Sequence, residues 1–198
     1  MPPDGARKEV RPWLTAILDV RTAAFVGWVV CLTPSSDSIS CALRRAILQY
    51  GVPKAFYRDN GKDFQAARFG ENAATYRPPS WDEVSRWPAI VAEPERQTVF
   101  ETLGVYTTDA LPYHAWSKPI ESMFGAWSKR YENLLPGYCG HDAKQKPERL
   151  AGEIQRGEIL SWPDMEQVVG ALIHHWNTTR PIGERQAPPL ALYEDHNP

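Results

Sequence analysis

Two consecutive apolar runs near the start of the chain limit its fold most strongly. They lie within residues 11–32, RPWLTAILDVRTAAFVGWVVCL, and a polar break near Arg21 and Thr22 separates them. Both runs are rich in β-branched and aromatic residues, which are typical of strands, so the segment predicts an antiparallel hairpin. The 198 residues include 18 prolines, above the usual share of about 5 %. A uniform helical bundle and a coiled coil are therefore excluded.

The rest of the pattern alternates helices with strands. After N-cap candidates in the run Pro-Ser-Ser-Asp, a helix is predicted by apolar residues at helical spacing, Ile39, Leu43, Ile47 and Tyr50, until Gly51 and Pro53 stop it. The short run KAFYR then predicts a strand that brings Asp59 to its carboxyl end. The later elements follow in chain order: a short helix over 97–103, a strand over 105–112, a helix from 117 to about 134, an exposed loop to 157, a helix over 162–177 and an irregular tail. This pattern predicts an α/β fold.

Composition and charge exclude several classes of protein. The formal net charge of −2 and pI near 6.2 are unlike a free-standing nucleic-acid-binding domain, so any polynucleotide has to be held by a local site or a larger assembly. Three cysteines without paired spacing argue against a disulfide framework or a structural zinc and indicate a reducing compartment. Because the sequence has no transmembrane-length apolar stretch and no signal-peptide pattern, we expect a soluble cytoplasmic protein.

Two acidic residues are candidates for chemistry. Asp59, in YRDNGKDF, follows a strand and precedes a glycine turn, so a rigid element would hold its carboxylate at an open edge. An ordinary turn aspartate explains it equally well. Glu121, in KPIES, falls in the first turn of a helix, where its charge also simply complements the helix dipole. Neither residue identifies a function alone.

Together and in this order, the two contexts resemble a known family. YGVPKAFYRDNGKDF and LPYHAWSKPIESMFGAW are similar to the segments around the second Asp and the Glu of the DDE transposase and retroviral integrase core, with the Mu-type phage transposase branch closest. RPWLTAILDVRTAAFVGWVV resembles the family's second and third strands, and HHWNTTRPIGERQAPPLALYE its closing Asn- and Pro-containing segment. The resemblance therefore covers nearly the whole chain.

The resemblance implies an RNase H-like mixed sheet with flanking helices and a site of three carboxylates that holds two Mg²⁺ or Mn²⁺ ions. Hard oxygen ligands suit Mg²⁺, and two ions can stabilise the attacking and leaving oxygens of a displacement at phosphorus. Asp59 and Glu121 match the last two ligands of the family. Its first ligand lies on a first strand that we expect this chain to lack, as in an N-terminally truncated transposase. Asp19 is a weak substitute, with a turn or capping role as its alternative.

The family also implies transposon-end and target DNA as partners, and an oligomer of transposase subunits. Lys118 precedes Glu121 by one turn and is the better candidate for a phosphate contact, although a solvated lysine explains it too. His114 and Asn60 are further candidates for contacting DNA. We expect an incomplete RNase H-like core over residues 1–140, an exposed loop over 141–160, and a helix with an irregular tail over 161–198 that belong to the same core.

The predicted function is metal-dependent DNA strand cleavage and strand transfer, as in integration and transposition. Since the first catalytic Asp is absent, we expect the chain to be inactive by itself. The main alternative is a catalytically dead RNase H-like module retained for DNA binding or assembly. A metal nuclease from another RNase H-like family is a third possibility, which the KPIE context disfavours.

Overall fold

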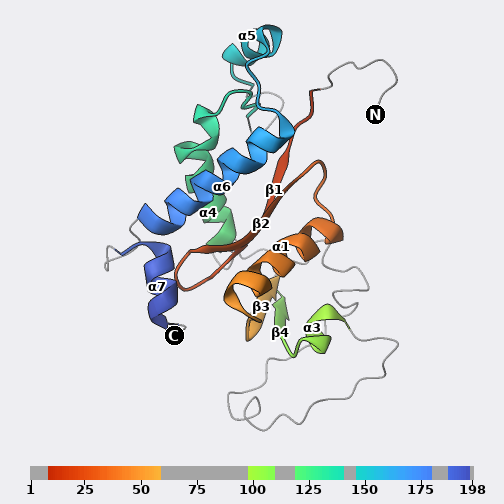
Figure 1. The fold of residues 1–198 in the computed structure, drawn as a ribbon, viewed down its shortest axis with the longest axis vertical. Coiled ribbons are helices and arrows are strands. Elements are labelled where there is room, and N and C mark those ends of the chain that lie inside the picture. The colour runs from red at the N-terminus through yellow and green to blue at the C-terminus, as the bar shows by residue number, and fades with distance from the viewer. Residues whose placement is uncertain (1–8, 59–97, 110–118, 141–145, 180–186, 197–198) are drawn as a thin grey trace.

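The computed structural model describes residues 9–58, 98–109, 119–140, 146–179 and 187–196 (Figure 1). Among the described elements, helices and strands alternate from α1 to α4, as the sequence predicts. In chain order they are β1 (Trp13–Leu18), β2 (Phe25–Cys31), α1 (Ser36–Tyr50), β3 (Ala55–Arg58), α3 (Val99–Thr102), β4 (Tyr106–Asp109), α4 (Pro119–Arg130), the 3₁₀ helix η5 (Glu132–Leu134), α5 (Arg149–Arg156), α6 (Trp162–Thr179) and α7 (Pro189–His196). The mixed α/β class is confirmed.

The described strands form two separate pairs. β1 and β2 are antiparallel, with Trp13 opposite Cys31 and an irregularity between Ile17 and Leu18, so the predicted hairpin is confirmed. β3 and β4 are parallel, and their last residues, Arg58 and Asp109, are partners. Within the described residues, no ladder joins the two pairs. The single mixed sheet that the resemblance implies is therefore not continuous across this part of the chain.

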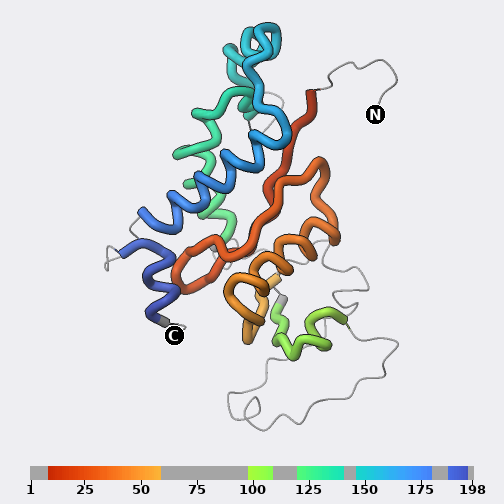
Figure 2. The backbone as a smooth tube through the Cα atoms, in the orientation of Figure 1, coloured from red at the N-terminus to blue at the C-terminus, as the bar shows by residue number. Residues whose placement is uncertain are grey.

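The hairpin is covered on both faces. Side chains along a strand alternate between its faces. On β1, Leu14, Ala16 and Leu18 pack against one core cluster, whereas Ile17 packs against another. Figure 1 shows α4 and α6 on one side of the hairpin and α1 on the other. The hairpin therefore lies between helices on both of its faces, as the backbone trace in Figure 2 also shows.

Helix α1 connects the two strand pairs. It begins with a capping box in which Ser35 accepts from the Ser38 backbone N–H, and the Ser38 hydroxyl accepts from the backbone N–H of Ser35. Its buried face packs on the hairpin and belongs to a second apolar cluster shared with β3 and α3: Ile39, Leu43, Phe56, Phe100 and Val105, with Ile17 of β1 packed against them. One helix thus holds β1 and β3 in a common layer.

The larger core is aromatic and lies between the hairpin, α4 and α6. Phe25 of β2 meets Trp127 of α4 edge-on, with ring centroids 5.3 Å apart, and Trp176 of α6 at 5.9 Å. Both tryptophans are essentially inaccessible to solvent. Edge-to-face rings add stability beyond the apolar area they bury. Because α6 supplies Trp176, the C-terminal part of the chain completes the core begun by the N-terminal hairpin.

Two segments differ from the sequence-based predictions. The expected loop contains helix α5, which has no buried residue and ends at Gly157 in the left-handed conformation. The tail predicted to be irregular contains α7, whose Tyr193 ring contacts Tyr50 of α1 at 5.1 Å. Each helix is only eight residues long, and two turns are too short for apolar periodicity to reveal a helix in the sequence. None of the described helices is long and apolar enough to cross a membrane.

Replacing Gly27 with alanine should destabilise the protein by about 1–3 kcal/mol, because an added methyl group would overpack the contact between β2 and α1. A Cβ at this position would lie 2.2 Å from the backbone oxygen of Ala42 and 3.0 Å from the Ala46 Cβ. Urea denaturation followed by circular dichroism measures the change. Gly125→Ala is the matched control: nothing lies within 4 Å of its added Cβ, and helix propensity should make it neutral or stabilising. Equal effects of the two changes would contradict this packing.

Candidate functional site

The parallel strands β3 and β4 end side by side. Their last residues, Arg58 and Asp109, are partners in the ladder, so both carboxyl ends lie at the same edge. Parallel α/β sheets commonly bind ligands beyond this edge. Asp59 follows Arg58 directly in the sequence but lies outside the described residues, as do Asn60, His114 and Lys118. The chain therefore brings a candidate carboxylate to the edge at which such folds place chemistry.

Glu121 lies in the first turn of α4, where the sequence predicts it. Pro119 is the first residue of this helix, a position that needs no backbone N–H donor. The Glu121 residue is exposed to solvent. An exposed carboxylate in the first turn of a helix is accessible to a cation or a phosphate-bound metal. Its proximity to Asp59 stays a prediction, since Asp59 is not among the described residues.

Arg58 is a feature of this edge that the sequence analysis did not single out. It occupies the last position of β3, immediately before Asp59, and only 6 % of its surface is exposed. A guanidinium is seldom buried to this extent without acidic or carbonyl partners. In the sequence, the burial of Arg58 was signalled only by its position two residues after Phe56 in a short strand, because alternate residues of a strand share a face. Arg58 is thus a candidate for positioning the carboxylates that follow.

Asp19 has a structural role in the turn between β1 and β2. One carboxylate oxygen accepts from the Thr22 backbone N–H at 2.8 Å and from the Thr22 hydroxyl at 2.7 Å. Its backbone N–H donates to Ala24 and its carbonyl accepts from Ala23, both at 2.8 Å. Burial raises the pKa of Tyr193 in α7, and the negative charge of Asp19 raises it further. The predicted alternative, a turn role for Asp19, accounts for its hydrogen bonds to residues 22–24.

The described residues supply only part of the predicted metal site. They include no group of three or more His, Cys, Asp or Glu side chains that could hold a metal ion. Glu121 is the described member of the predicted ligand pair, and its oxygen donors are of the type that Mg²⁺ prefers. The donor chemistry is thus compatible with a hard divalent cation, with Asp59 as the second predicted ligand.

Asn177 of α6 is a key polar residue of the core, and it falls in the segment that resembles the family's closing Asn. Its amide group makes two hydrogen bonds to the first residue of β2. The side-chain oxygen accepts from the Phe25 backbone N–H at 2.9 Å, and the side-chain nitrogen donates to the Phe25 carbonyl at 2.8 Å. Asn177 therefore satisfies both backbone groups of Phe25, as a neighbouring strand would.

Comparisons with known proteins identify the fold. No protein-family model and no curated protein matches the sequence. A chain in the cryo-EM structure of the simian T-cell lymphotropic virus intasome in complex with PP2A regulatory subunit B56 gamma is similar, with a TM-score of 0.57 and 14 % identity over 93 % of this chain. This chain spans 48 % of the intasome chain. The catalytic core domain of BIV integrase aligns with a TM-score of 0.47 and 14 % identity, over 92 % of this chain and 86 % of that one. The chain has an integrase-like mixed α/β fold.

Proposed function

We propose that this chain is the catalytic core of a DNA transposase or integrase of the Mu-type branch, which cleaves and joins DNA strands with divalent metal ions. The main supporting observation is that, in an integrase-like fold, Asp59 directly follows the end of a parallel strand pair and Glu121 lies in the first turn of helix α4. Asp59 and Glu121 are the proposed ligands of Mg²⁺ or Mn²⁺. Such ions stabilise negative charge at phosphorus and on the leaving oxygen.

Contacts with DNA are assigned to residues around these carboxylates. Lys118, His114 and Asn60 are the proposed contacts to the phosphate backbone, because phosphate contacts fix the position of a DNA strand. A net charge of −2 gives little general attraction to DNA, so the site has to act locally and within an oligomer of subunits. In this proposal the protein acts in the cytoplasm of a bacterium or a phage-infected cell.

The proposed catalytic unit is residues 1–140 completed by residues 161–198. The aromatic core supports this division, since Phe25 of β2, Trp127 of α4 and Trp176 of α6 pack together. Residues 141–160 project from the unit in this proposal, which is consistent with the lack of buried residues in α5.

We also propose that a further strand, from outside the described residues, lies between β1 and β3 and carries the third carboxylate. Topology supports this proposal. Among the described residues β1 pairs only with β2 and β3 only with β4, yet α1 packs against both pairs in one layer. An edge strand with open backbone groups accepts another strand readily. A strand in this place would join the pairs into one mixed sheet.

DNA cleavage by two forms of the protein tests the function. We call the printed sequence, preceded by the residues encoded directly upstream of it, the extended chain. The extended chain should nick supercoiled DNA and join DNA ends with Mg²⁺, whereas the printed chain should do neither, because two carboxylates leave a two-metal site incomplete. Gel electrophoresis of plasmid and labelled oligonucleotides measures both reactions. DNA binding by the extended chain without cleavage or joining would instead favour the catalytically dead module.

Calorimetry with Mn²⁺ tests the ligands in the printed chain itself. We expect weak binding that Asp59→Asn and Glu121→Gln each reduce at least about tenfold, since each removes one of only two charged oxygen donors. Asp19→Asn is the control. The asparagine oxygen can still accept from Thr22, so the turn should survive and Mn²⁺ binding should not change. Loss of binding in Asp19→Asn alone would make Asp19 the ligand and refute the present assignment.

A further inference from the structure

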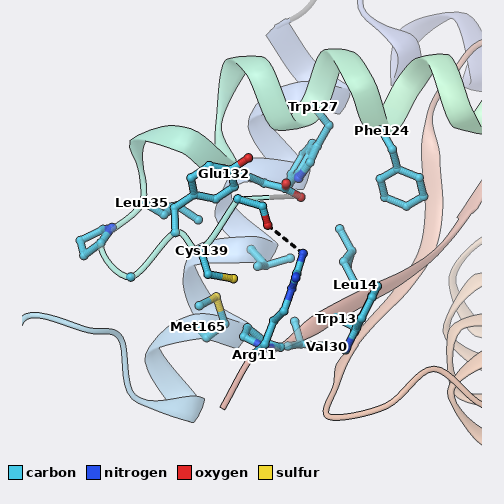
Figure 3. Close-up of a pocket in the computed structure, with 16 residues that line it drawn as sticks. Arg11, Trp13, Leu14, Val30, Phe124, Trp127, Glu132, Leu135, Cys139 and Met165 are labelled. Carbon is cyan, nitrogen blue, oxygen red and sulfur yellow. Dashed lines mark hydrogen bonds between the residues drawn. The ribbon is translucent and has the colours of Figure 1, made fainter. Parts of the chain in front are cut away.

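A second candidate site lies between the start of β1, the far end of α4, the segment after η5 and helix α6. It is a cavity of about 380 Å³, within the range of small-molecule sites. Its walls are largely apolar and include Leu14, Val30, Phe124, Trp127 and Met165 (Figure 3). Helix α4 contributes Phe124 and Trp127 to the cavity, whereas Glu121 in its first turn is not among the lining residues, so the cavity is distinct from the proposed catalytic site.

The indole N–H of Trp127 is an unused donor in the wall of this cavity. Trp127 is 1 % exposed, and none of the hydrogen bonds among the described residues involves its indole nitrogen. Trp176 provides a contrast, because its indole N–H donates to the Ala23 carbonyl at 3.1 Å. No fully enclosed side-chain N or O atom in the described part of the chain lacks a partner. The Trp127 N–H therefore keeps some accessible surface, and because Trp127 lines the cavity, this donor is available to a molecule bound there.

Glu132, the first residue of η5, lines the same cavity and offers acceptors. Glu132 is half-buried, and its carboxylate makes no ion pair or hydrogen bond with another described residue. Arg11 also lines the cavity, but it donates to the Gly140 carbonyl at 2.8 Å, as the dashed line in Figure 3 marks. One buried donor and one carboxylate acceptor thus border a mostly apolar space.

We propose that this cavity binds a planar aromatic small molecule that has a hydrogen-bond acceptor next to a donor, as in a lactam or an aromatic amide. The ring would pack against Phe124 and Met165. Its carbonyl would accept from the Trp127 N–H, and its N–H would donate to the Glu132 carboxylate. A hydrocarbon would fill the space but leave the two polar groups without partners, which costs binding energy. The proposal does not depend on the assigned DNA chemistry.

Three bicyclic probes of similar size test the proposal on the full chain: quinolin-2-one has the acceptor and the donor, quinoline has the acceptor alone, and naphthalene has neither. Saturation-transfer NMR and calorimetry measure binding. We expect quinolin-2-one to bind about tenfold or more tightly than naphthalene, which corresponds to about 1.4 kcal/mol. Quinoline should fall between them.

Two variants distinguish specific binding in the cavity from nonspecific adsorption to the protein surface. Glu132→Leu removes the acceptor and should abolish the preference for quinolin-2-one over quinoline. Cys139→Phe places a ring in the cavity from its half-buried wall and should abolish binding of all three probes. Thermal unfolding checks that both variants are folded. Absence of binding to the parent chain, equal affinity for quinolin-2-one and naphthalene, or binding that both folded variants retain would each overturn the proposal.

Discussion

Replacing Glu121 with glutamine in the extended chain should lower metal-dependent DNA cleavage by about a thousandfold or more. The substitution keeps the size of the side chain and removes one negative charge from the proposed metal ligands. Loss of about 4 kcal/mol of transition-state stabilisation corresponds to a factor of this size. Cleavage of a labelled DNA substrate over time measures the rate. Stability and DNA affinity should change little, because Glu121 is exposed and phosphate contacts are assigned to other residues.

Glu166→Gln is the matched control for this experiment. Glu166 lies on α6, and its pair with Arg45, at 3.8 Å, is solvent-exposed on both sides. Surface pairs of this kind contribute at most about 1 kcal/mol, so cleavage and stability should both stay near those of the parent chain. Cleavage at the parent rate by Glu121→Gln would remove Glu121 from the catalytic assignment. A collapse of DNA affinity would instead assign it to substrate binding.

Replacing Asn177 with leucine should lower the free energy of unfolding by about 2–5 kcal/mol. Asn177 is 5 % exposed and makes the two hydrogen bonds, of 2.9 Å and 2.8 Å, to the backbone of Phe25. Leucine has a similar size but leaves a buried N–H and a buried C=O without partners, each of which costs about 1–3 kcal/mol. Urea denaturation measures the loss.

The adjacent Thr178 provides the control for this substitution. Its hydroxyl donates to the His174 carbonyl within the same helix, and this hydrogen bond is exposed to solvent, so Thr178→Ala should change stability by no more than about 0.5 kcal/mol. If Asn177→Leu is as stable as the parent chain, another group must satisfy the Phe25 backbone. The double hydrogen bond would then not hold α6 to β2.

Local patterns in the sequence predicted the elements that have strong local signals. The hairpin followed from its β-rich runs, and α1 from its apolar spacing and its stop at Gly51 and Pro53. Helices α5 and α7 were missed because each has only eight residues, which is too short for apolar periodicity to stand out in the sequence. Sequence patterns therefore predicted the elements that are long enough for a buried face to show as regularly spaced apolar residues.

Long-range features were beyond such patterns. No spacing rule pairs Asn177 with Phe25 or places Trp127 and Glu132 on one cavity, because these relations arise only when distant elements pack. The sequence did predict Glu121 in the first turn of its helix and gave a turn role as the alternative for Asp19, whose contacts are those of a turn residue. The assignment of Asp59 stays a prediction.

The bond between Phe25 and Asn177 also affects how the chain is made in the cell. The two residues are 152 positions apart, and ribosomes add about 5–20 residues each second, so roughly 8–30 s pass between their synthesis. Helix α1 follows β2 closely and can cover one face of the hairpin early. The other face has to wait for Trp176 and its neighbours, exposing an aromatic surface on the nascent chain. Binding of a chaperone to this surface during translation would protect the hairpin until α6 emerges.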